Sequence, residues 1–461
     1  MVSAQSLEVV MVAFEGPDGY SQAGGLGVRA RELTRALAAR GLRTTLVFVG
    51  DPELPPDGED HGVRLVRFGQ AISKRHPAGV YAGEMEKVRA LTEQLPRWVA
   101  RRVVAPAAAE GRSVAVFAEE WHTAAFCHRL SDHLHRMGLR QRCAILWNAN
   151  NTFGFERIDW PTLGYVAAIT TVSRYMKHLM WPYGVNATVI PNGIPGSALR
   201  PVDGLAVAAI RSAAGVPCLT FKRGRWSPDK RWHQALGSIA QLRANGVPAR
   251  MLMRGGMEPF GGEVIAHGQA LGLEPADWNE PLEDAAGVVR ALTETGGAPL
   301  VNLCRFVPDA LLPEIDVAAT AVLANSGHEP FGLVGLEAMA AGAVAVVGAT
   351  GEEYARPYGN AIVTETEDPV EVASALRGLV ERPALARRLR QTARRDAADF
   401  TWERVVDGLL ERLRFVCQHQ GVALAEIPVR RARQSGPGAS SASARSAAPR
   451  ESGTSRTPTR E

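Results

Sequence analysis

The chain has 461 residues, of which 46% are hydrophobic and 6% aromatic, and a formal net charge of +4. This length exceeds one ordinary domain and predicts two domains with sizeable cores plus an extra segment. The residues from Arg430 onward carry seven Arg and two Glu, so residues 1–429 have a net charge of only −1. Such a nearly neutral body argues against nucleic acid as a partner.

Cysteine and apolar patterns narrow the class of protein further. The five cysteines are widely scattered and form no CxxC or Cys/His cluster, so we expect neither disulfides nor structural zinc, and a reducing cytoplasmic location. The apolar run 7–14 has no basic region before it and predicts a buried strand rather than a signal peptide. No apolar stretch approaches the roughly 20 residues that span a bilayer, so no integral membrane segment is expected.

In the first half, short apolar runs alternate with longer amphipathic stretches, which is typical of parallel β/α/β units. After the strand at 7–14, a Gly-rich turn precedes a predicted helix that ends near Gly41. Further strands are predicted at 44–50, 113–120, 143–150 and 167–172. The segment 189–201 is rich in Pro, Gly and Asn and predicts a linker.

The second half repeats the alternation. Strands are predicted at 218–224, 249–256, 299–306, 316–323 and 343–348. We therefore expect an N-terminal Rossmann-like domain at 1–195 and a C-terminal one at 196–400. Residues 401–416 predict a helix with one apolar face. Residues 431–461 contain no Val, Ile, Leu, Met, Phe, Trp or Tyr and predict a disordered tail.

Several residues that can carry chemistry follow predicted strands of the first half. The segment Gln22–Gly27 contains Gly24, Gly25 and Leu26, and its glycines allow a bound phosphate or sugar to approach the backbone. His122 follows the strand at 113–120. Asn148 lies near the end of the strand at 143–150, and Ser173 follows the strand at 167–172. His122, Ser173 and the glycines also allow other interpretations. A lone His is usually structural, Ser173 suits a helix N-cap, and dinucleotide-binding folds use similar glycine turns.

Two charged segments follow strands of the second half. Arg225 and Lys230 leave the strand at 218–224 together, where two cations can neutralise a diphosphate leaving group. Glu329 and Glu337 flank the start of a predicted helix after the strand at 316–323. Backbone amides at a helix start attract anions, and carboxylates accept hydrogen bonds from sugar hydroxyls. Taken alone, these groups could also be a solvated turn and favourable charges near a helix N-terminus.

Together these motifs resemble those of retaining GT-B glycosyltransferases, chiefly glycosyltransferase family 4 and the glycogen and starch synthases. The string from Glu329 to Gly342 is similar to the family's E-x7-E signature, including Phe331, Gly332 and Leu333. The G-R-x-x-x-x-K turn, the Gly-Gly-Leu loop and the W-H-T-A segment also match, and the resemblance spans about residues 8–416. Five positions depart from the family pattern: Gln22 for Lys, Glu120 for Asp, Trp147 for His, Pro195 for Asp and Arg231 for Gly.

The resemblance implies an α/β GT-B fold, with two Rossmann-like doubly wound domains facing a cleft and helix 401–416 returning to the N-terminal domain. It implies transfer of a sugar from a nucleotide-sugar donor to an acceptor hydroxyl, with retention of anomeric configuration. The nucleotide-sugar is a substrate, so no cofactor is expected. We find no DxD-type motif and no carboxylate cluster with cation-ligand spacing, so no metal is expected either.

The resemblance also assigns roles to single residues. Arg225 and Lys230 would hold the donor diphosphate, and the amides of Phe331–Leu333 would face the phosphate or sugar. Glu329 would take sugar hydroxyls and Glu337 the ribose. His122 and the Gly24–Leu26 loop would close over the sugar from the other side, with Asn148 and Ser173 as possible donor or acceptor contacts.

Three alternatives stay open at this point. A glycogen or starch synthase would extend an α-glucan from ADP-glucose; the segment at His122 favours it, whereas Gln22 does not. A dinucleotide-dependent oxidoreductase would use the glycines near Gly25 but leaves the E-x7-E string unexplained. An inactive GT-B module would bind sugar or protein. The donor base, donor sugar and acceptor, which could be a carbohydrate or a small molecule, are not specified by the sequence.

Overall fold

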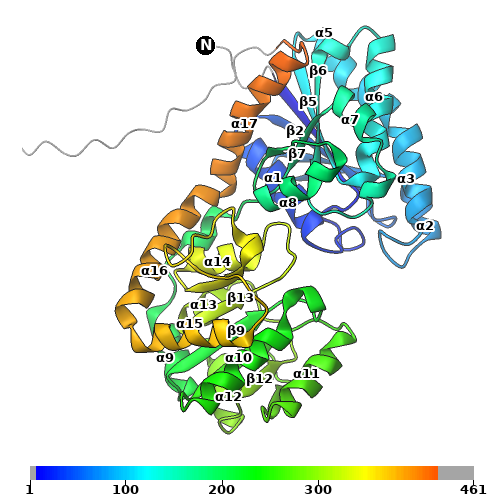
Figure 1. The fold of residues 1–461 in the computed structure, drawn as a ribbon. Coiled ribbons are helices and arrows are strands. Elements are labelled where there is room, and N and C mark those ends of the chain that lie inside the picture. Colours follow the sequence, from blue (N-terminus) through cyan, green and yellow to red (C-terminus); the bar gives the residue numbers. More distant parts are fainter. Residues whose placement is uncertain (1–6, 424–461) are drawn as a thin grey trace, which may run out of the picture. The chain divides into compact units, whose positions relative to one another are not determined.

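The computed structural model describes residues 7–423, which form two separate sheets covered by helices (Figure 1). By its internal contacts, this described part of the chain falls in one compact unit that contains both sheets. The predicted α/β fold with two Rossmann-like halves is confirmed. The predicted disordered tail at 431–461 lies outside the described residues.

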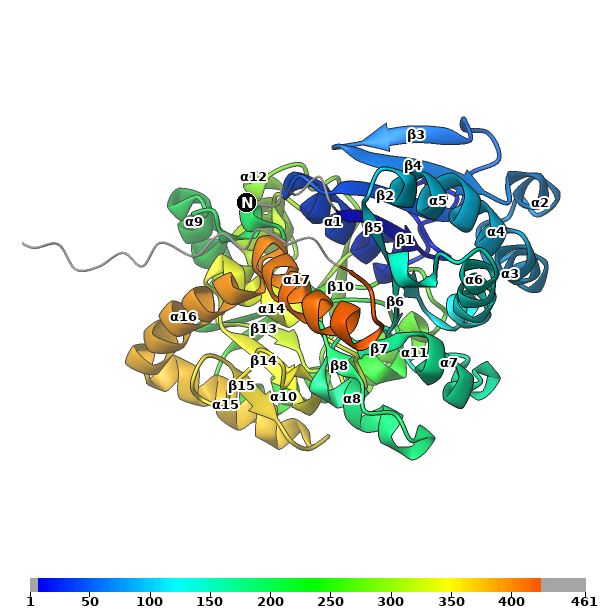
Figure 2. The same ribbon diagram turned by 90° about the horizontal axis from the view of Figure 1, so that it is seen from above.

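The first sheet has eight strands in the order β3-β4-β2-β1-β5-β6-β7-β8. Neighbouring strands are parallel except for the antiparallel pair of β3 and β4 at one edge (Figure 2). The strands are β1 (Leu7–Val12), β2 (Arg43–Val49), β3 (Asp57–Asp60), β4 (Val63–Phe68), β5 (Ser113–Glu119), β6 (Cys143–Ala149), β7 (Ala168–Thr171) and β8 (Thr188–Val189).

Both faces of the first sheet are buried. Successive side chains of a strand point to opposite faces, so Val9 and Met11 of β1 join one apolar cluster while Val10 and Val12 join the other. The helices around this sheet are α1 (Gly25–Ala39), α2 (Gln70–Arg75), α3 (Glu84–Glu93), α4 (Leu95–Val99), α5 (Ala105–Ala109), α6 (Ala124–Arg136), α7 (Trp160–Val166) and α8 (Arg174–Met180).

The second sheet has seven strands, all parallel, in the order β11-β12-β10-β9-β13-β14-β15. The strands are β9 (Cys218–Arg223), β10 (Ala249–Arg254), β11 (Pro275–Trp278), β12 (Leu300–Leu303), β13 (Ala321–Ala324), β14 (Ala345–Gly348) and β15 (Ile362–Thr364). Its helices are α9 (Gly204–Ala214), α10 (Trp232–Ala244), α11 (Phe260–Ala270), α12 (Ala285–Glu294), α13 (Leu312–Ala318), α14 (Leu333–Ala341), α15 (Pro369–Glu381) and α16 (Pro383–Ala397).

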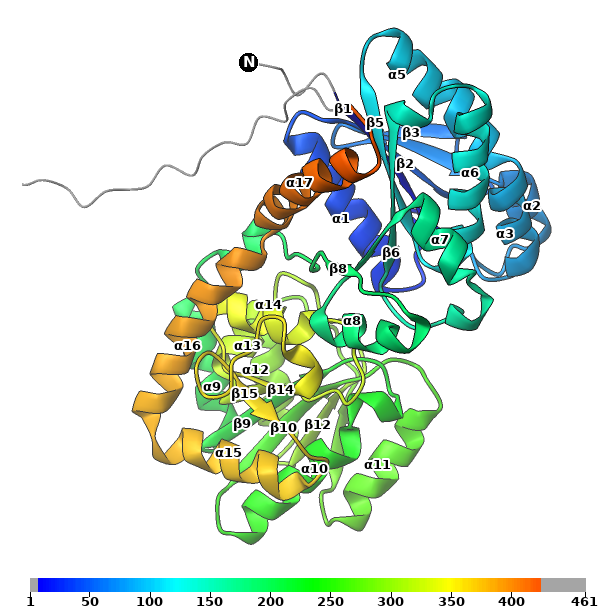
Figure 3. The same ribbon diagram turned by 45° about the horizontal axis from the view of Figure 1, so that its top comes forward.

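The last described helix, α17 (Trp402–His419), packs on the first sheet and not on the second. Its apolar face is formed by Val405, Val406, Leu409, Leu410 and Leu413, all buried in the same cluster as Leu33 and Leu37 of α1. Figure 3 shows α17 lying beside α1. The sequence predicted this apolar face from its helical spacing, because burial of such a face is what stabilises an amphipathic helix.

The chain passes between the two sheets at two places that lie side by side. The amide of Ile194 donates to the carbonyl of Phe400 at 2.9 Å, and the amide of Trp402 donates to the carbonyl of Ile194 at 3.0 Å. The boundary predicted at 195/196 falls at this crossing.

The strand orders define where a ligand is expected in each half. In the first sheet the order reverses between β1 and β5, and in the second between β9 and β13. In open parallel sheets, ligands bind at the carboxyl ends of the strands where the order reverses. The segments that follow β1, β5, β9 and β13 are those in which the sequence placed most of its candidate residues.

Candidate active site

Two of the predicted residues meet at the reversal point of the second sheet. Lys230 follows β9, Glu329 follows β13, and the Lys230 Nζ lies 2.8 Å from the Glu329 Oε1. The two side chains are 17% and 22% exposed, so the pair is accessible without being fully solvated. The arrangement places a cation and a hydroxyl-binding carboxylate side by side.

Arg225 lies in the same turn as Lys230 but has a different environment. The residue is exposed, and none of the described residues forms a hydrogen bond or ion pair with its guanidinium. Its backbone is fixed, because its carbonyl accepts a hydrogen bond from the indole of the buried Trp232 at 2.9 Å. Arg225 therefore presents an unpaired cation on an anchored backbone, as an anion-binding residue should.

Glu337 is paired with Arg223, a residue that the sequence analysis did not assign to the site. Arg223 is the last residue of β9, and its guanidinium contacts both Asp316 of α13 and Glu337, the latter at 3.1 Å. Burial raises the pKa of Asp316 to about 6, against the opposing effect of Arg223. The sequence feature that could have identified Arg223 is a cation at the end of an apolar strand, because a buried charge there requires a partner.

The start of α14 has the conformation of an anion-binding helix terminus. Gly332 is the N-cap residue with φ 81°, in the left-handed region that favours glycine, and no side chain caps the helix. Phe331 is buried, and the hydroxyl of Tyr354 donates to the carbonyl of Gly332. None of the described residues accepts a hydrogen bond from the amides of Phe331, Gly332 or Leu333. These amides remain open to a ligand.

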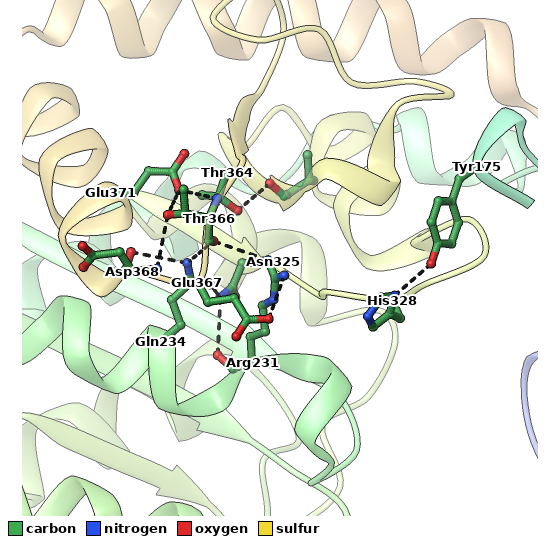
Figure 4. A network of polar contacts seen from close by, with 11 residues as sticks. Tyr175, Arg231, Gln234, Asn325, His328, Thr364, Thr366, Glu367, Asp368 and Glu371 are labelled. Atoms are coloured by element: carbon green, nitrogen blue, oxygen red, sulfur yellow. Dashed lines mark hydrogen bonds and ion pairs between the residues drawn. The ribbon is translucent and has the colours of Figure 1, made fainter. Parts of the chain in front are cut away.

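The loop that leads from β13 to Glu329 is anchored at both ends (Figure 4). At its start, the Asn325 side chain donates to the Gln234 side chain at 2.8 Å, and Gln234 donates to the carbonyl of Thr366 at 2.9 Å. At its other end, the Tyr175 hydroxyl lies 2.9 Å from the His328 Nδ1. These contacts limit the positions that Glu329 can adopt.

Arg231, which stands where the family has Gly, belongs to the same anchor. Its backbone has φ 50°, in the left-handed region, which explains why glycine is favoured at this position. Its guanidinium lies 3.1 Å from the Glu367 carboxylate, and both residues are drawn in Figure 4. This ion pair gives the arginine a structural role that a glycine cannot have.

At the reversal point of the first sheet, His122 is held between aromatic rings. It lies in a short helix, Trp121–Thr123, with ring centroids 4.0 Å from Phe14 and 4.2 Å from Trp121. Its Nε2 lies 2.9 Å from the Glu84 carboxylate, and since a carboxylate only accepts, Nε2 carries the proton. Burial lowers the pKa of His122 to about 4, against the opposing effect of Glu84. The imidazole is neutral at pH 7, and its buried Nδ1 is an acceptor without a partner in the described part of the chain.

Residues next to His122 form a buried polar cluster. Glu120 has φ 68°, a conformation rarely adopted by residues other than glycine, and its carboxylate accepts the amide of Asn150 at 2.7 Å. Burial raises the pKa of Glu120 to about 8. Asn148, a possible ligand contact by sequence, instead donates to Glu119 at 2.9 Å and is 3% exposed.

The Gly-rich loop binds an anion that belongs to the chain. The amides of Ala23, Gly24 and Gly27 donate to the Glu15 Oε2 at 3.0–3.2 Å. The hydroxyl of Tyr81 donates to the other oxygen at 2.6 Å. The sequence suggested a phosphate or sugar beside these glycines, but in this arrangement the three amides are already satisfied.

Ser173 combines the two roles considered for it in the sequence. Its hydroxyl oxygen accepts the amide of Met176 at 3.1 Å, which makes Ser173 the N-cap of α8. The same hydroxyl donates to the carbonyl of Pro330, one residue beyond Glu329. Ser173 therefore joins α8 to the loop that carries a candidate catalytic glutamate.

Residues 7–423 contain neither a metal-binding group of side chains nor a membrane-spanning helix. No group of three or more His, Cys, Asp or Glu side chains in this range could hold a metal ion. Within the same range, no helix combines the length and the apolar composition needed to cross a bilayer.

Each half of the chain matches a known family. Residues 23–196 match the family model described as Glycosyltransferase Family 4, and residues 216–396 match Glycosyl transferases group 1. A D-inositol 3-phosphate glycosyltransferase from Geodermatophilus obscurus is 28% identical over 242 residues, which are 51% of this chain and 49% of that protein. The chain thus spans about half the length of the curated relatives it matches.

Solved structures are similar to nearly all of the described chain. A sucrose-phosphate synthase from Thermosynechococcus elongatus gives a TM-score of 0.60 at 19% identity, covering 89% of this chain and 99% of that structure. Anabaena HepE in complex with UDP and glucose gives a TM-score of 0.58 at 15% identity, covering 88% and 99%. At these identities the likeness establishes the fold. The chain thus has the GT-B fold, and its two halves match the models of Glycosyltransferase Family 4 and Glycosyl transferases group 1.

Proposed function

We propose that this protein transfers a sugar from a nucleoside-diphosphate sugar to an acceptor hydroxyl, with retention of anomeric configuration and without a catalytic metal. The observation that carries the proposal is the Lys230–Glu329 pair beside the unpaired Arg225 at the reversal point of the second sheet. Cations at this point can stabilise the charge that develops on a departing diphosphate. The adjacent carboxylate can hold the sugar from which that diphosphate leaves.

In the proposed reaction, Arg225 and Lys230 bind the diphosphate, with the free amides of Phe331–Leu333 facing its phosphate or sugar. Glu329 accepts hydrogen bonds from sugar hydroxyls, and Glu337, oriented by Arg223, takes the ribose. His122 adds a neutral acceptor at Nδ1. The acceptor hydroxyl attacks from the face of the leaving group, and its proton passes to the departing phosphate.

The donor and the acceptor are proposed only as classes. The similar HepE structure holds UDP and glucose, and the similar Geodermatophilus protein is named for inositol 3-phosphate. UDP-, ADP- and GDP-sugars are therefore the donors to test, with inositol phosphates and simple carbohydrates as acceptors. No cofactor is required, since the nucleotide-sugar is itself the substrate.

The deciding experiment is a donor screen that measures release of nucleoside diphosphate with and without acceptors. We expect at least one donor to release nucleotide faster when an acceptor is present, and EDTA to leave that rate unchanged. Retention is read from the anomeric proton coupling of the product in an NMR spectrum. If no donor reacts or binds, the chain is an inactive GT-B module rather than a transferase.

The dinucleotide-dependent oxidoreductase is disfavoured by a specific contact. After β1, the amides of Ala23, Gly24 and Gly27 are bonded to Glu15, and a second negative charge there would be repelled. A thermal-shift comparison separates the two classes: a nucleoside diphosphate should raise the melting temperature, and NAD should not.

A further inference from the structure

Lys87 of α3 is a buried cation whose bonds all go to neutral oxygens. The residue is 1% exposed. Its Nζ donates to the hydroxyl of Tyr20 at 2.7 Å, to the carbonyls of Val80 and Ala82 at 2.7 Å each, and to that of Gly79 at 3.2 Å. The ammonium also lies 5.0 Å from the centre of the Tyr20 ring. A buried charge is tolerated only when it is hydrogen-bonded, so this pocket is fitted to a lysine.

The carbonyls that Lys87 binds belong to one turn, residues 79–83. The turn includes Gly79 with φ 124° and Gly83 with φ 68°, conformations that side chains rarely adopt. Its start is joined to Tyr20, since the amide of Val80 donates to the Tyr20 carbonyl at 3.2 Å. Lys87 therefore binds the turn through backbone carbonyl oxygens that no other described cation contacts.

Two side chains connect this turn to the two candidate elements of the first sheet, which are the Gly-rich loop and His122. Tyr81 donates to Glu15 at 2.6 Å, and Glu15 in turn orders the amides of the Gly-rich loop. Glu84, directly after the turn, lies 2.9 Å from the His122 Nε2. The rings of Tyr81 and His122 are themselves 6.1 Å apart.

We infer that Lys87 is a positioning residue for sugar transfer, because it fixes the turn whose side chains orient both the Gly-rich loop and His122. The inference rests on the proposed function, in which His122 contributes an acceptor at Nδ1, and on the resemblance, which implies that the Gly-rich loop closes over the donor sugar beside it. A lysine that only stabilised the fold would affect stability and leave the His122 environment and the turnover unchanged.

The test uses Lys87→Met, which keeps the side-chain length and removes the charge. The groups facing His122 are Glu84 from α3, Arg157 over the Trp121 ring, and the Tyr81 ring. Burial, the largest cause, holds the pKa of His122 at about 4 against Glu84, which raises it, so a loosened turn changes both contributions. We expect the NMR titration midpoint of the His122 ring to move by about one pH unit or more, and turnover to fall about 10-fold.

Arg250→Met is the matched control. Arg250 of β10 is 2% exposed and donates to the carbonyls of Ala214, Leu292 and Ala298, so its loss also removes a buried cation from backbone oxygens. This control should lower the melting temperature without moving the His122 titration or the turnover. A folded Lys87→Met protein with a native His122 titration and native turnover overturns the inference.

A milder variant decides the matter if Lys87→Met does not fold. Tyr20→Phe removes one of the four Lys87 acceptors and should move the His122 titration midpoint in the same direction as Lys87→Met, by a smaller amount. An unchanged midpoint and turnover in folded Tyr20→Phe overturn the inference. The NMR titration does not depend on activity, so a protein that transfers no sugar refutes the proposed function separately.

Discussion

Arg225 and Lys230 carry the same charge in the same turn but are not electrostatically equivalent. Lys230 is already paired with Glu329, whereas no described residue pairs with the Arg225 guanidinium. A diphosphate must share Lys230 with Glu329, while Arg225 can form its bonds without breaking any. Of the two cations, Arg225 therefore provides the cleaner test of diphosphate binding.

Arg225→Ala should lower turnover about 100-fold or more, the usual order for removing one electrostatic stabiliser of the transition state. The free energy of unfolding should change by less than about 0.5 kcal/mol, because the exposed guanidinium has no hydrogen bond or ion pair with a described residue to lose. Steady-state kinetics and urea unfolding measure the two effects. Arg404→Ala, an exposed arginine of α17, is the matched control and should change neither. Undiminished turnover in Arg225→Ala would refute the phosphate assignment.

Glu120 makes stability depend on pH. Burial raises its pKa to about 8, so between its ordinary pKa near 4.5 and this value the folded state binds a proton that the unfolded state lacks. Its stabilising contribution is fully present below about pH 4.5 and is lost as pH rises through about 8. His122, whose pKa is lowered to about 4, adds a slope of opposite sign that fades as pH rises above its ordinary pKa of 6.5.

Glu120→Gln should therefore flatten the fall in the free energy of unfolding between pH 6.5 and 8. The expected difference in slope is on the order of 1 kcal/mol per pH unit, set by one proton. Urea unfolding at several pH values measures it, and Glu59→Gln on the edge strand β3 should leave the slope unchanged. Parallel slopes for wild type and Glu120→Gln would show that Glu120 is ionised in the folded protein.

At the scale of elements, α8 and α14 are coupled through one hydroxyl. Ser173 caps α8 by accepting the Met176 amide and also donates to the Pro330 carbonyl in the loop before α14. Beside it, Arg174 pairs with Glu353 at 3.2 Å. The start of α8 is thus bonded to segments on both sides of α14 in the sequence.

Ser173→Ala should cost about 1 kcal/mol of stability for the lost cap, and more if the Pro330 carbonyl is left unsatisfied. It should also lower turnover several-fold, because Glu329 adjoins Pro330. Asp284→Ala is a matched cap deletion: Asp284 caps α12 by accepting the Gly287 amide at 3.0 Å. That control should lose similar stability and keep its turnover. If turnover is equal in the two variants, Ser173 acts only as a cap.

For the molecule as a whole, the two crossings between the sheets form one hydrogen-bonded ribbon. Ile194 bonds to Phe400 and Trp402, and Gly193 lies directly against the Trp402 ring. A Cβ at Gly193 would lie 2.5 Å from that ring. This contact explains why glycine is favoured at position 193, within the linker predicted at 189–201.

Gly193→Ala should destabilise the protein by about 1–3 kcal/mol, the usual cost of overpacking a rigid contact. Thermal or urea unfolding measures it. Gly204→Ala at the start of α9 is the control, because a Cβ there meets nothing within 4 Å and an alanine restricts the unfolded chain. That variant should be neutral or slightly stabilising. A neutral Gly193→Ala would mean that Trp402 can move aside freely.

The local pattern of the chain was sufficient for most strands and helices, the apolar face of α17, and the segments after β1, β5, β9 and β13. It missed β3, β4, β8, β11 and β15, and the strand predicted at 316–323 was wrong at its start, because α13 extends to Ala318. Each correct prediction depends on residues near one another in sequence: strand period, helical spacing and turn chemistry. Strand order could not be obtained in this way, because parallel pairing joins segments far apart in the chain.

The tertiary structure determines which charged residues pair with one another. Arg223 with Asp316 and Glu337, Glu15 with the Gly-rich loop, and Lys87 with its turn all join separate elements. A sequence motif can indicate that a charge is needed at a strand end, but only packing determines whether that charge is free, as in Arg225, or already satisfied, as in Glu15. Residue type is encoded locally, whereas the electrostatic environment that makes a residue useful arises from elements that meet only after folding.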